Sequence, residues 1–227
     1  MKKRVVVISL GGSLIVPAKI DLKFLQKFEE ILKKHTRKYK FVVVCGGGTV
    51  ARKYIKALRA NKSSEYMQNL VGISVTRLNA RFMSYIFDED PDFGIPHDMK
   101  HVKGLLRKNN IVFCGALRYA PHQTSDSTSA KLANYLKADF INMTNVKGLY
   151  DRDPKKKGAK FIPRATREEL YKLIKAVKAK PGQHAPLDMV AMKVIKKNKI
   201  PLYIIGKDLK QLKNILDGKK FIGTIVD

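Results

Sequence analysis

The sequence lacks tryptophan and has only two cysteines in 227 residues. Cys45 and Cys114 stand far apart, and no cysteine or histidine lies beside either at zinc-ligand spacing, which argues against a disulfide framework and a structural zinc site. No hydrophobic run approaches the roughly 20 residues that a transmembrane helix needs. These absences predict a protein of a reducing compartment that does not span a membrane.

The first residues imitate a secretory signal, because a basic start precedes the apolar run Val5–Leu10. That run ends at Gly11 and is shorter than the usual signal core of about 7–15 residues. A buried strand followed by a glycine turn explains the same residues without a processing step. We therefore expect a cytoplasmic protein.

Acidic residues are scarce, because 19 Asp and Glu stand against 46 Lys and Arg, a formal net charge of +27. Such an excess suggests nucleic acid, an acidic membrane surface or an anionic substrate as partner. The lysines are spread along the chain, and no aromatic-rich RNA-binding motif accompanies them. The pattern favours a solvated lysine-rich surface over dedicated nucleic-acid binding.

Short runs rich in Val, Ile and Phe alternate with helical patterns, and they are continuously apolar, as is typical of strands buried on both faces. This alternation predicts an α/β fold, a three-layer αβα sandwich with a mainly parallel central sheet, in one domain over 1–227. Thr166 and Glu169 form a capping box that marks one helix start. The expected strands are Val5–Leu10, Phe41–Cys45, Ile111–Cys114, Phe140–Met143, Leu202–Ile205 and Phe221–Val226. The expected helices are Leu22–His35, Val50–Ala60, Leu70–Phe87, Met99–Lys108, Ser127–Leu136, Arg167–Lys178, Met189–Lys197 and Leu209–Leu216.

Three expected strands run directly into glycine: Val5–Leu10 into Gly11-Gly12-Ser13, Phe41–Cys45 into Gly46-Gly47-Gly48, and Ile111–Cys114 into Gly115. In open parallel sheets ligands bind beyond the carboxyl ends of the strands, so these turns should share one rim. Glycine lets backbone N–H groups approach a ligand, and a following helix N-terminus favours an anion. The glycines also suit tight turns alone, but the first two loops together favour a phosphate site.

Familiar nucleotide fingerprints are missing, since neither the G-x-x-x-x-G-K-[ST] loop nor a G-x-G-x-x-G turn is present. What is present, in order, resembles the amino acid kinase superfamily and most closely its archaeal-type UMP kinases. The motifs that carry this resemblance nearly end to end are Leu10-Gly11-Gly12-Ser13, 46–54 (GGGTVARKY), Gly72-Ile73, 76–80 (TRLNA), 121–126 (PHQTSD), 144–154 (TNVKGLYDRDP), and Leu187-Asp188 with Ala191 and Lys193.

The resemblance implies transfer of the ATP γ-phosphate to UMP, with Mg²⁺ on the ATP, in a cytoplasmic homo-oligomer, a hexamer by family resemblance. It places acceptor binding in the N-terminal half, about 1–138, and nucleotide binding in the C-terminal half, about 139–227. The ATP-binding positions would be Gly12, Ser13, Gly48, Arg52, Thr144, Asn145, Tyr150 and Asp153. The UMP-binding positions would be Gly47, Asn69, Tyr119, Ala120, Pro121, His122, Gln123, Thr124 and Ser125.

Transfer between two phosphates needs positioning and charge neutralisation more than acid–base groups. Arg52 and Lys193 are the catalytic candidates for that cationic work, and the chain itself offers no metal-ligand set. Lys193 also reads as one more surface lysine, and Thr124 to Asp126 reads as an ordinary helix cap.

Three residues depart from the family pattern. Ser9 stands where many superfamily members have lysine, Asn69 replaces the aspartate of the ribose contact, and Lys147 stands where the nucleotide loop commonly has aspartate. Two alternatives remain open. One is another kinase of this fold, acting on isopentenyl phosphate, carbamate or an amino-acid carboxylate. The other is a non-catalytic basic binder of nucleic acid or of an oxoanion.

Overall fold

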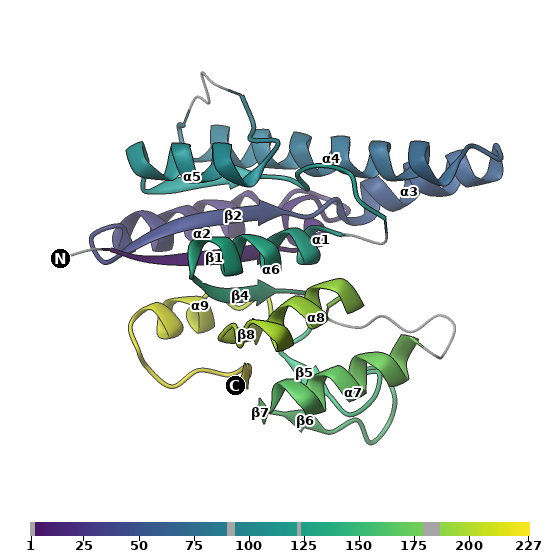
Figure 1. Cartoon of the computed structure of the whole chain (residues 1–227). Helices are drawn as coiled ribbons and strands as arrows, with labels where there is room; N and C mark the ends of the chain where they lie inside the picture. The colour runs from purple at the N-terminus through teal and green to yellow at the C-terminus, as the bar shows by residue number, and fades with distance from the viewer. Residues whose placement is uncertain (1–2, 90–93, 122–123, 179–186) are drawn as a thin grey trace.

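The computed structural model describes residues 3–89, 94–121, 124–178 and 187–227. Its centre is a seven-stranded sheet in the order β3-β2-β1-β4-β8-β9-β7 (Figure 1). All neighbours in this sheet are parallel except β8 and β9, which pair antiparallel. The strands are β1 (Arg4–Leu10), β2 (Tyr39–Cys45), β3 (Ile111–Cys114), β4 (Asp139–Met143), β7 (Arg164–Ala165), β8 (Leu202–Ile205) and β9 (Thr224–Val226), and a separate hairpin joins β5 (Leu149–Tyr150) to β6 (Phe161–Ile162).

Helices cover both faces of this sheet, which confirms the predicted three-layer α/β fold (Figure 1). One face packs against α5, α6 and α8, with α7 beside α8, and the other packs against α1, α2, α4 and α9. The helices are α1 (Gly12–Ile15), α2 (Leu22–His35), α3 (Gly48–Ala60), α4 (Glu65–Ile86), α5 (Met99–Lys108), α6 (Ser125–Leu136), α7 (Arg167–Lys178), α8 (Met189–Lys197) and α9 (Leu209–Leu216).

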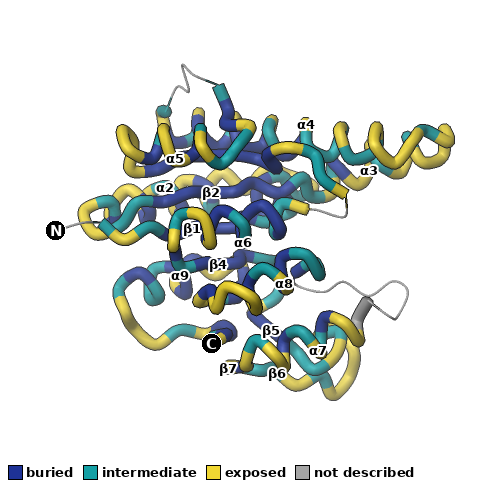
Figure 2. Tube along the Cα trace, viewed as in Figure 1, coloured by how far each residue is buried: buried dark blue, intermediate teal, exposed yellow. Residues whose placement is uncertain are grey.

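The continuous apolar strands are explained by this double cover. On β1, Val7 belongs to the core beneath α6 and α8, whereas Val6 and Ile8 belong to the core beneath α2 and α9. Successive side chains of a strand point to opposite faces, so both sets must be apolar. Figure 2 shows the central strands as a buried band between more exposed helices. Cys45 and Cys114 are free thiols, and each is buried in the hydrophobic core on a different face of the sheet. Their distance in the sequence had argued against a disulfide framework.

The helix starts were predicted too late at three places. Helix α3 begins at Gly48 where Val50 was expected, α4 at Glu65 where Leu70 was expected, and α6 at Ser125 where Ser127 was expected. The residues missed in α3 and α6 are glycine or polar, and in α4 the early Tyr66 and Met67 are exposed, so these first turns do not continue the buried apolar face. The α4 start is fixed by a cap, because the Ser64 hydroxyl accepts from the Met67 N–H at 3.3 Å.

The last strand was predicted too long, because β9 covers only Thr224–Val226 and Phe221 lies before it. The short α1, β5, β6 and β7 were not expected, since elements of two to four residues leave no periodic signal.

The capping box is confirmed: Glu169 Oε2 accepts from the Thr166 N–H at 2.7 Å, and the Glu169 N–H donates to Thr166 Oγ1 at 3.2 Å. One sheet runs through both expected halves, because β1 pairs with β4.

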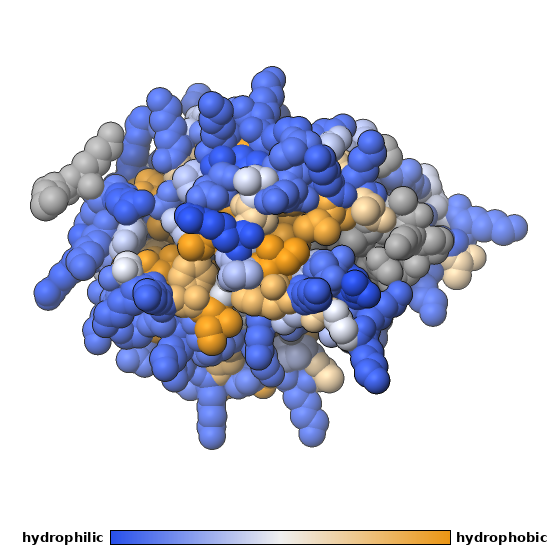
Figure 3. Space-filling view, turned by 90° about the horizontal axis from the view of Figure 1, so that it is seen from below, coloured by the Kyte–Doolittle hydropathy of each residue, from blue (hydrophilic) through white to orange (hydrophobic). Residues whose placement is uncertain are grey.

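Much of the surface is hydrophilic, as expected for a chain with 46 Lys and Arg. Figure 3 shows hydrophilic side chains projecting all around one face, with a hydrophobic area at its middle. Among the described residues, no helix combines the length and apolarity needed to cross a membrane.

Candidate functional site

The first two glycine loops touch at the carboxyl ends of β1 and β2. The Gly46 N–H donates to the Leu10 carbonyl at 2.9 Å, and the Gly11 N–H donates to the Met143 carbonyl at 3.1 Å. A Cβ on Gly12 would collide with backbone atoms of Gly46 and Gly48. Because neither loop leaves room for a side chain at this contact, the two backbones form one continuous rim, as predicted.

Gly48 needs to be glycine for a second reason. Its φ is +61°, in the left-handed region that other residues adopt only with strain. This turn starts α3, so the free N–H groups of the first helical turn face the rim. A helix N-terminus carries a partial positive charge, which suits a phosphate there.

Helix α4 holds the second and third glycine loops in place. The buried Asn79 amide donates to the Gly46 carbonyl at 2.7 Å, and Thr76 Oγ1 accepts from the Ala116 N–H at 2.9 Å. The Arg77 guanidinium donates to the Leu117 carbonyl at 2.5 Å, and partial burial lowers its pKa. A Cβ on Gly115 would lie 2.5 Å from Thr76 Oγ1, so glycine is required for this close approach.

A cleft of about 270 Å³ opens where these loops meet α3, α4 and α6. It brings together eight of the predicted site residues, namely Gly47, Gly48, Arg52, Asn69, Tyr119, Ala120, Thr124 and Ser125. Pro121 is exposed and does not line the cleft, and the predicted His122 and Gln123 lie outside the described residues. The cleft is also lined by residues that the sequence analysis did not single out, among them Ile55, Ala116, Arg118 and Thr128. The Gly115 turn was the signal that could have pointed to Ala116 and Arg118.

Two arginines give the cleft a positive charge. Arg52 stands in the second turn of α3, and its guanidinium donates to Thr49 Oγ1 at 3.0 Å. Arg118 is largely exposed and lies 3.5 Å from the Asp98 carboxylate. Both guanidinium groups can turn toward an anion, because their contacts with Thr49 and Asp98 are exposed to solvent and therefore weak.

The predicted ATP-side residues of the C-terminal half follow β4 or belong to the β5–β6 hairpin and its connecting turn, and they do not line the cleft. Thr144 follows β4, where its N–H donates to the Ile205 carbonyl at 2.9 Å, and Asn145 comes next. Tyr150 belongs to the β5–β6 hairpin and packs edge-on against Phe161, with ring centroids 5.5 Å apart. Asp153 stabilises the following turn by accepting from the Lys155 N–H at 3.0 Å.

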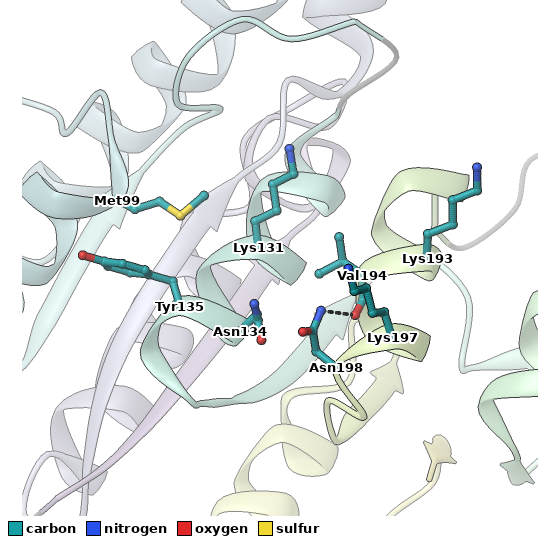
Figure 4. Close-up of a pocket in the computed structure, with 8 residues that line it drawn as sticks. All are labelled: Met99, Lys131, Asn134, Tyr135, Lys193, Val194, Lys197 and Asn198. Atoms are coloured by element: carbon teal, nitrogen blue, oxygen red, sulfur yellow. Dashed lines mark hydrogen bonds between the residues drawn. The ribbon is translucent and has the colours of Figure 1, made fainter.

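Lys193 is not part of the cleft lining. It lies on α8 and lines a separate groove together with Lys131 of α6 (Figure 4). The structure therefore does not bring this candidate beside Arg52, and its catalytic role stays a prediction.

Two carboxylates, Asp188 and Asp126, accept hydrogen bonds at the N-terminal end of α6. The sequence analysis quoted both in motifs but gave neither a role in the site. Asp188 Oδ2 accepts from Thr124 Oγ1 at 2.6 Å and from Ser127 Oγ at 2.6 Å, while its Oδ1 caps α8 at Ala191 N, 2.8 Å away. Asp126 accepts from the buried Ser9 hydroxyl at 2.9 Å. Asp126 was quoted as part of a motif, but its link to Ser9 is a contact across 117 positions that no local pattern reveals.

The pKa of Asp126 is raised to about 7, mainly by burial; the hydrogen bond from Ser9 lowers it and the nearby Asp188 charge raises it, and both effects are included in that value. A folded-state pKa above the unfolded value means that wild-type stability is lost as pH rises from about 4 through 7. Asp126→Asn removes that titration, and each tenfold difference in proton affinity between the folded and unfolded carboxyl corresponds to about 1.4 kcal/mol. The variant should therefore gain stability over wild type between pH 5 and pH 8, measured by urea unfolding of the ligand-free protein.

Asp208→Asn is the matched control, because hydrogen bonding from Gln211 lowers the pKa of that N-cap carboxyl. Its stability difference from wild type should be the same at pH 5 and pH 8. A pH-independent difference for Asp126→Asn as well would contradict the buried titration.

Within the described ranges, no three His, Cys, Asp or Glu side chains converge as metal ligands. Asp126 is a partly buried carboxylate beside the β1 rim, and carboxylate oxygens suit a hard cation such as Mg²⁺.

Comparison with known proteins identifies relatives along nearly the whole chain. The model of the amino acid kinase family matches residues 4–206. The chain is 34% identical to the uridylate kinase of Thermococcus gammatolerans over 225 residues, which cover 98% of this chain and 99% of that protein. It is 35% identical to the uridylate kinase of Methanoculleus marisnigri, over 100% of this chain and 96% of that protein. The crystal structure of uridylate kinase from Archaeoglobus fulgidus superposes with a TM-score of 0.84 at 31% identity, covering 98% of this chain and 99% of that one.

Proposed function

This chain belongs to the amino acid kinase family, and from that premise we propose that it is a UMP kinase, transferring the γ-phosphoryl group of ATP to UMP. The observation that carries the proposal is the cleft. It joins the glycine rim and Arg52 to Tyr119, Ala120, Thr124 and Ser125, the segment assigned to the uridine side. A phosphate on the rim would thus have its nucleoside against that segment.

The proposed transfer needs no catalytic base. An oxygen of the UMP phosphate, anionic near neutral pH, attacks the γ-phosphorus in line; the new P–O bond forms as the bond to the ADP oxygen breaks. The N–H groups of Gly47 and Gly48 and the Arg52 guanidinium would stabilise the moving phosphoryl group. The rim residues Gly12 and Ser13 would hold the donor phosphates, with Lys193 as a further cation.

We infer that Mg²⁺ enters with ATP. When bound with the donor nucleotide, Mg²⁺ would neutralise negative charge on the donor phosphates. Asp126 is the protein carboxylate that would face it, with Ser9 positioning the carboxylate through its hydroxyl. The adenosine of ATP would lie against the Thr144–Asn145 turn and the hairpin that carries Tyr150, in the C-terminal half, while the N-terminal half would bind UMP and the donor phosphates.

A coupled assay with ATP and Mg²⁺ tests the acceptor. UMP should be phosphorylated fastest, and CMP and dUMP measure how strictly the base and ribose are read. Isopentenyl phosphate, carbamate and amino acids cover the other kinases of this fold. Turnover with one of these and none with UMP would overturn the proposal.

Asn69 tests the ribose contact in the cleft. Its amide donates to the Glu65 carbonyl at 2.8 Å within α4. A carboxylate binds ribose hydroxyls through stronger, charge-assisted hydrogen bonds. Asn69→Asp should lower the UMP KM by a few-fold with little change in kcat. Unchanged or weaker UMP binding would contradict the assignment of this position.

We infer that the chain forms a homo-oligomer, a hexamer by family resemblance, through the outer face of α4. Met67, Leu70, Leu78 and Tyr85 are 57%, 38%, 63% and 53% exposed. Their spacing brings them to one side of a helix with 3.6 residues per turn. The N-terminal part of α4 extends beyond the carboxyl ends of the strands (Figure 1), where a second copy has access.

Leu78→Asp should therefore lower the oligomeric mass measured by light scattering while the monomer stays folded by circular dichroism. Ile222→Asp is the matched control, because Ile222 is 58% exposed but lies far from α4 in the chain, after α9. Equal masses for wild type and Leu78→Asp would exclude this face.

A further inference from the structure

A second hollow lies between α6 and α8 and reaches α5, outside the acceptor cleft (Figure 4). It is an open groove of about 450 Å³, a volume within the range of about 300–1,000 Å³ for small-molecule sites. Lys131 of α6 and Lys193 and Lys197 of α8 line it, and Met99, Tyr135 and Val194 supply apolar surface. The groove thus combines positive charge with an apolar wall.

The three lysines stand without compensating carboxylates. Among the described residues that line the groove there is no aspartate or glutamate. Within the same described part of the chain, none of the three ammonium groups has an ion-pair partner, although the neighbouring Lys196 pairs with Glu168 at 2.5 Å. Lys131 and Lys193 extend in the same direction from facing helices (Figure 4). Unpaired ammonium groups along one groove can each pair with a charged oxygen of the same multivalent anion, and charge-assisted hydrogen bonds of this kind are strong.

The other end of the groove is aromatic. The Tyr135 ring is 42% exposed, and Lys103 Nζ lies 5.3 Å from its centroid. Met99 lies beside this ring in the lining (Figure 4). A ring with one free edge or face can receive a flat group attached to the anion, as in a nucleotide.

We propose that this groove binds a linear polyphosphate, either free or as the chain of a nucleoside triphosphate, and that the bound anion inhibits phosphoryl transfer. Lys193 is the second cation that we assign to the reaction, and it lines the groove, so an anion bound there would hold its ammonium group away from the donor phosphates. The same helices meet at the cleft, where Asp188 of the α8 cap binds Thr124 at the start of α6. Inhibition rests on the proposed kinase function, whereas binding does not.

Binding is tested by tryptophan fluorescence, because the chain has no tryptophan of its own. Tyr135→Trp places a single reporter in the groove, and Met99→Trp provides a second if the first perturbs folding. Titration with inorganic tripolyphosphate should give a saturable signal. Adding Lys131→Ala with Lys197→Ala should weaken the apparent affinity at least tenfold.

The matched control is Lys23→Ala with Lys34→Ala, which removes the same charge from exposed positions of α2 on the opposite face of the sheet. This pair should change the affinity less than twofold. Equal weakening by both pairs would overturn the site, because the binding would then be non-specific electrostatic attraction to the basic surface. The absence of a saturable signal with either reporter would also overturn it, because no anion would then bind in the groove.

The two sources of polyphosphate are separated in the Met99→Trp reporter. Tighter binding of CTP than of tripolyphosphate, abolished by Tyr135→Ala, identifies a nucleotide, and equal binding identifies the free polyphosphate. In the coupled assay at saturating ATP, tripolyphosphate should inhibit wild type, while the Lys131→Ala, Lys197→Ala variant keeps its uninhibited turnover. Groove binding without inhibition would overturn the regulatory consequence. Absence of any UMP phosphorylation would overturn the kinase function, and the fluorescence titration would still decide the site.

Discussion

Arg52→Ala should lower kcat for UMP phosphorylation by about 10²-fold or more, the loss expected when one donor to a developing anion is removed. Arg52 is placed for this role because it lines the cleft in the second turn of α3, directly behind Gly47 and Gly48. Its one side-chain hydrogen bond in the described chain is to Thr49, a neutral hydroxyl that an incoming phosphate can replace. Steady-state kinetics with varied ATP and UMP measure the effect, and KM for UMP should change less than kcat.

Arg59→Ala is the control on the same helix. Arg59 bonds the Gln68 side chain at 3.4 Å and does not line the cleft. Its kcat should stay within about twofold of wild type, since surface contacts of this kind contribute little. Near-normal turnover of Arg52→Ala would remove this residue from the mechanism.

Gly12→Ala should abolish most activity and also destabilise the fold. The added Cβ would lie 2.6 Å from the Gly46 carbonyl carbon and still closer to the Gly48 nitrogen. These are backbone atoms, so the substitution can be accommodated only if the first two loops move apart. We expect kcat to fall more than about 10²-fold, because misplaced donors lose their alignment, and stability to fall by about 1–3 kcal/mol, as for other overpacked sites.

Gly104→Ala is the matched control for this substitution. Gly104 lies in α5, and a Cβ there would meet nothing within 4 Å. Because alanine is the better helix former, this variant should be more stable by about 0.5–1 kcal/mol with unchanged kinetics. Urea unfolding and the coupled assay measure both variants, and wild-type activity in Gly12→Ala would refute the contact between the loops.

The sequence by itself determined the layered α/β fold and the rim of the site. The stretches Val5–Ile8, Val42–Val44 and Leu202–Ile205 have consecutive apolar residues, and burial on both faces of a sheet makes such a pattern favourable. Glycine directly after β1, β2 and β3 marked the strand ends, and the order of the motifs identified eight residues that now line one cleft.

Only the tertiary structure decided how distant residues meet. Asp126 depends on Ser9, Asp188 joins the starts of α6 and α8, and Asn79 of α4 holds the Gly46 carbonyl. These contacts span tens of residues and repeat with no period, so no local pattern contains them. Lys193 is the clearest case: its motif predicts a place at the phosphates, and only the packing of α8 against α6 shows that it also lines an outer groove. The direction in which a surface side chain points depends on how its helix packs against its neighbours. That packing is determined by burial of apolar residues throughout the core.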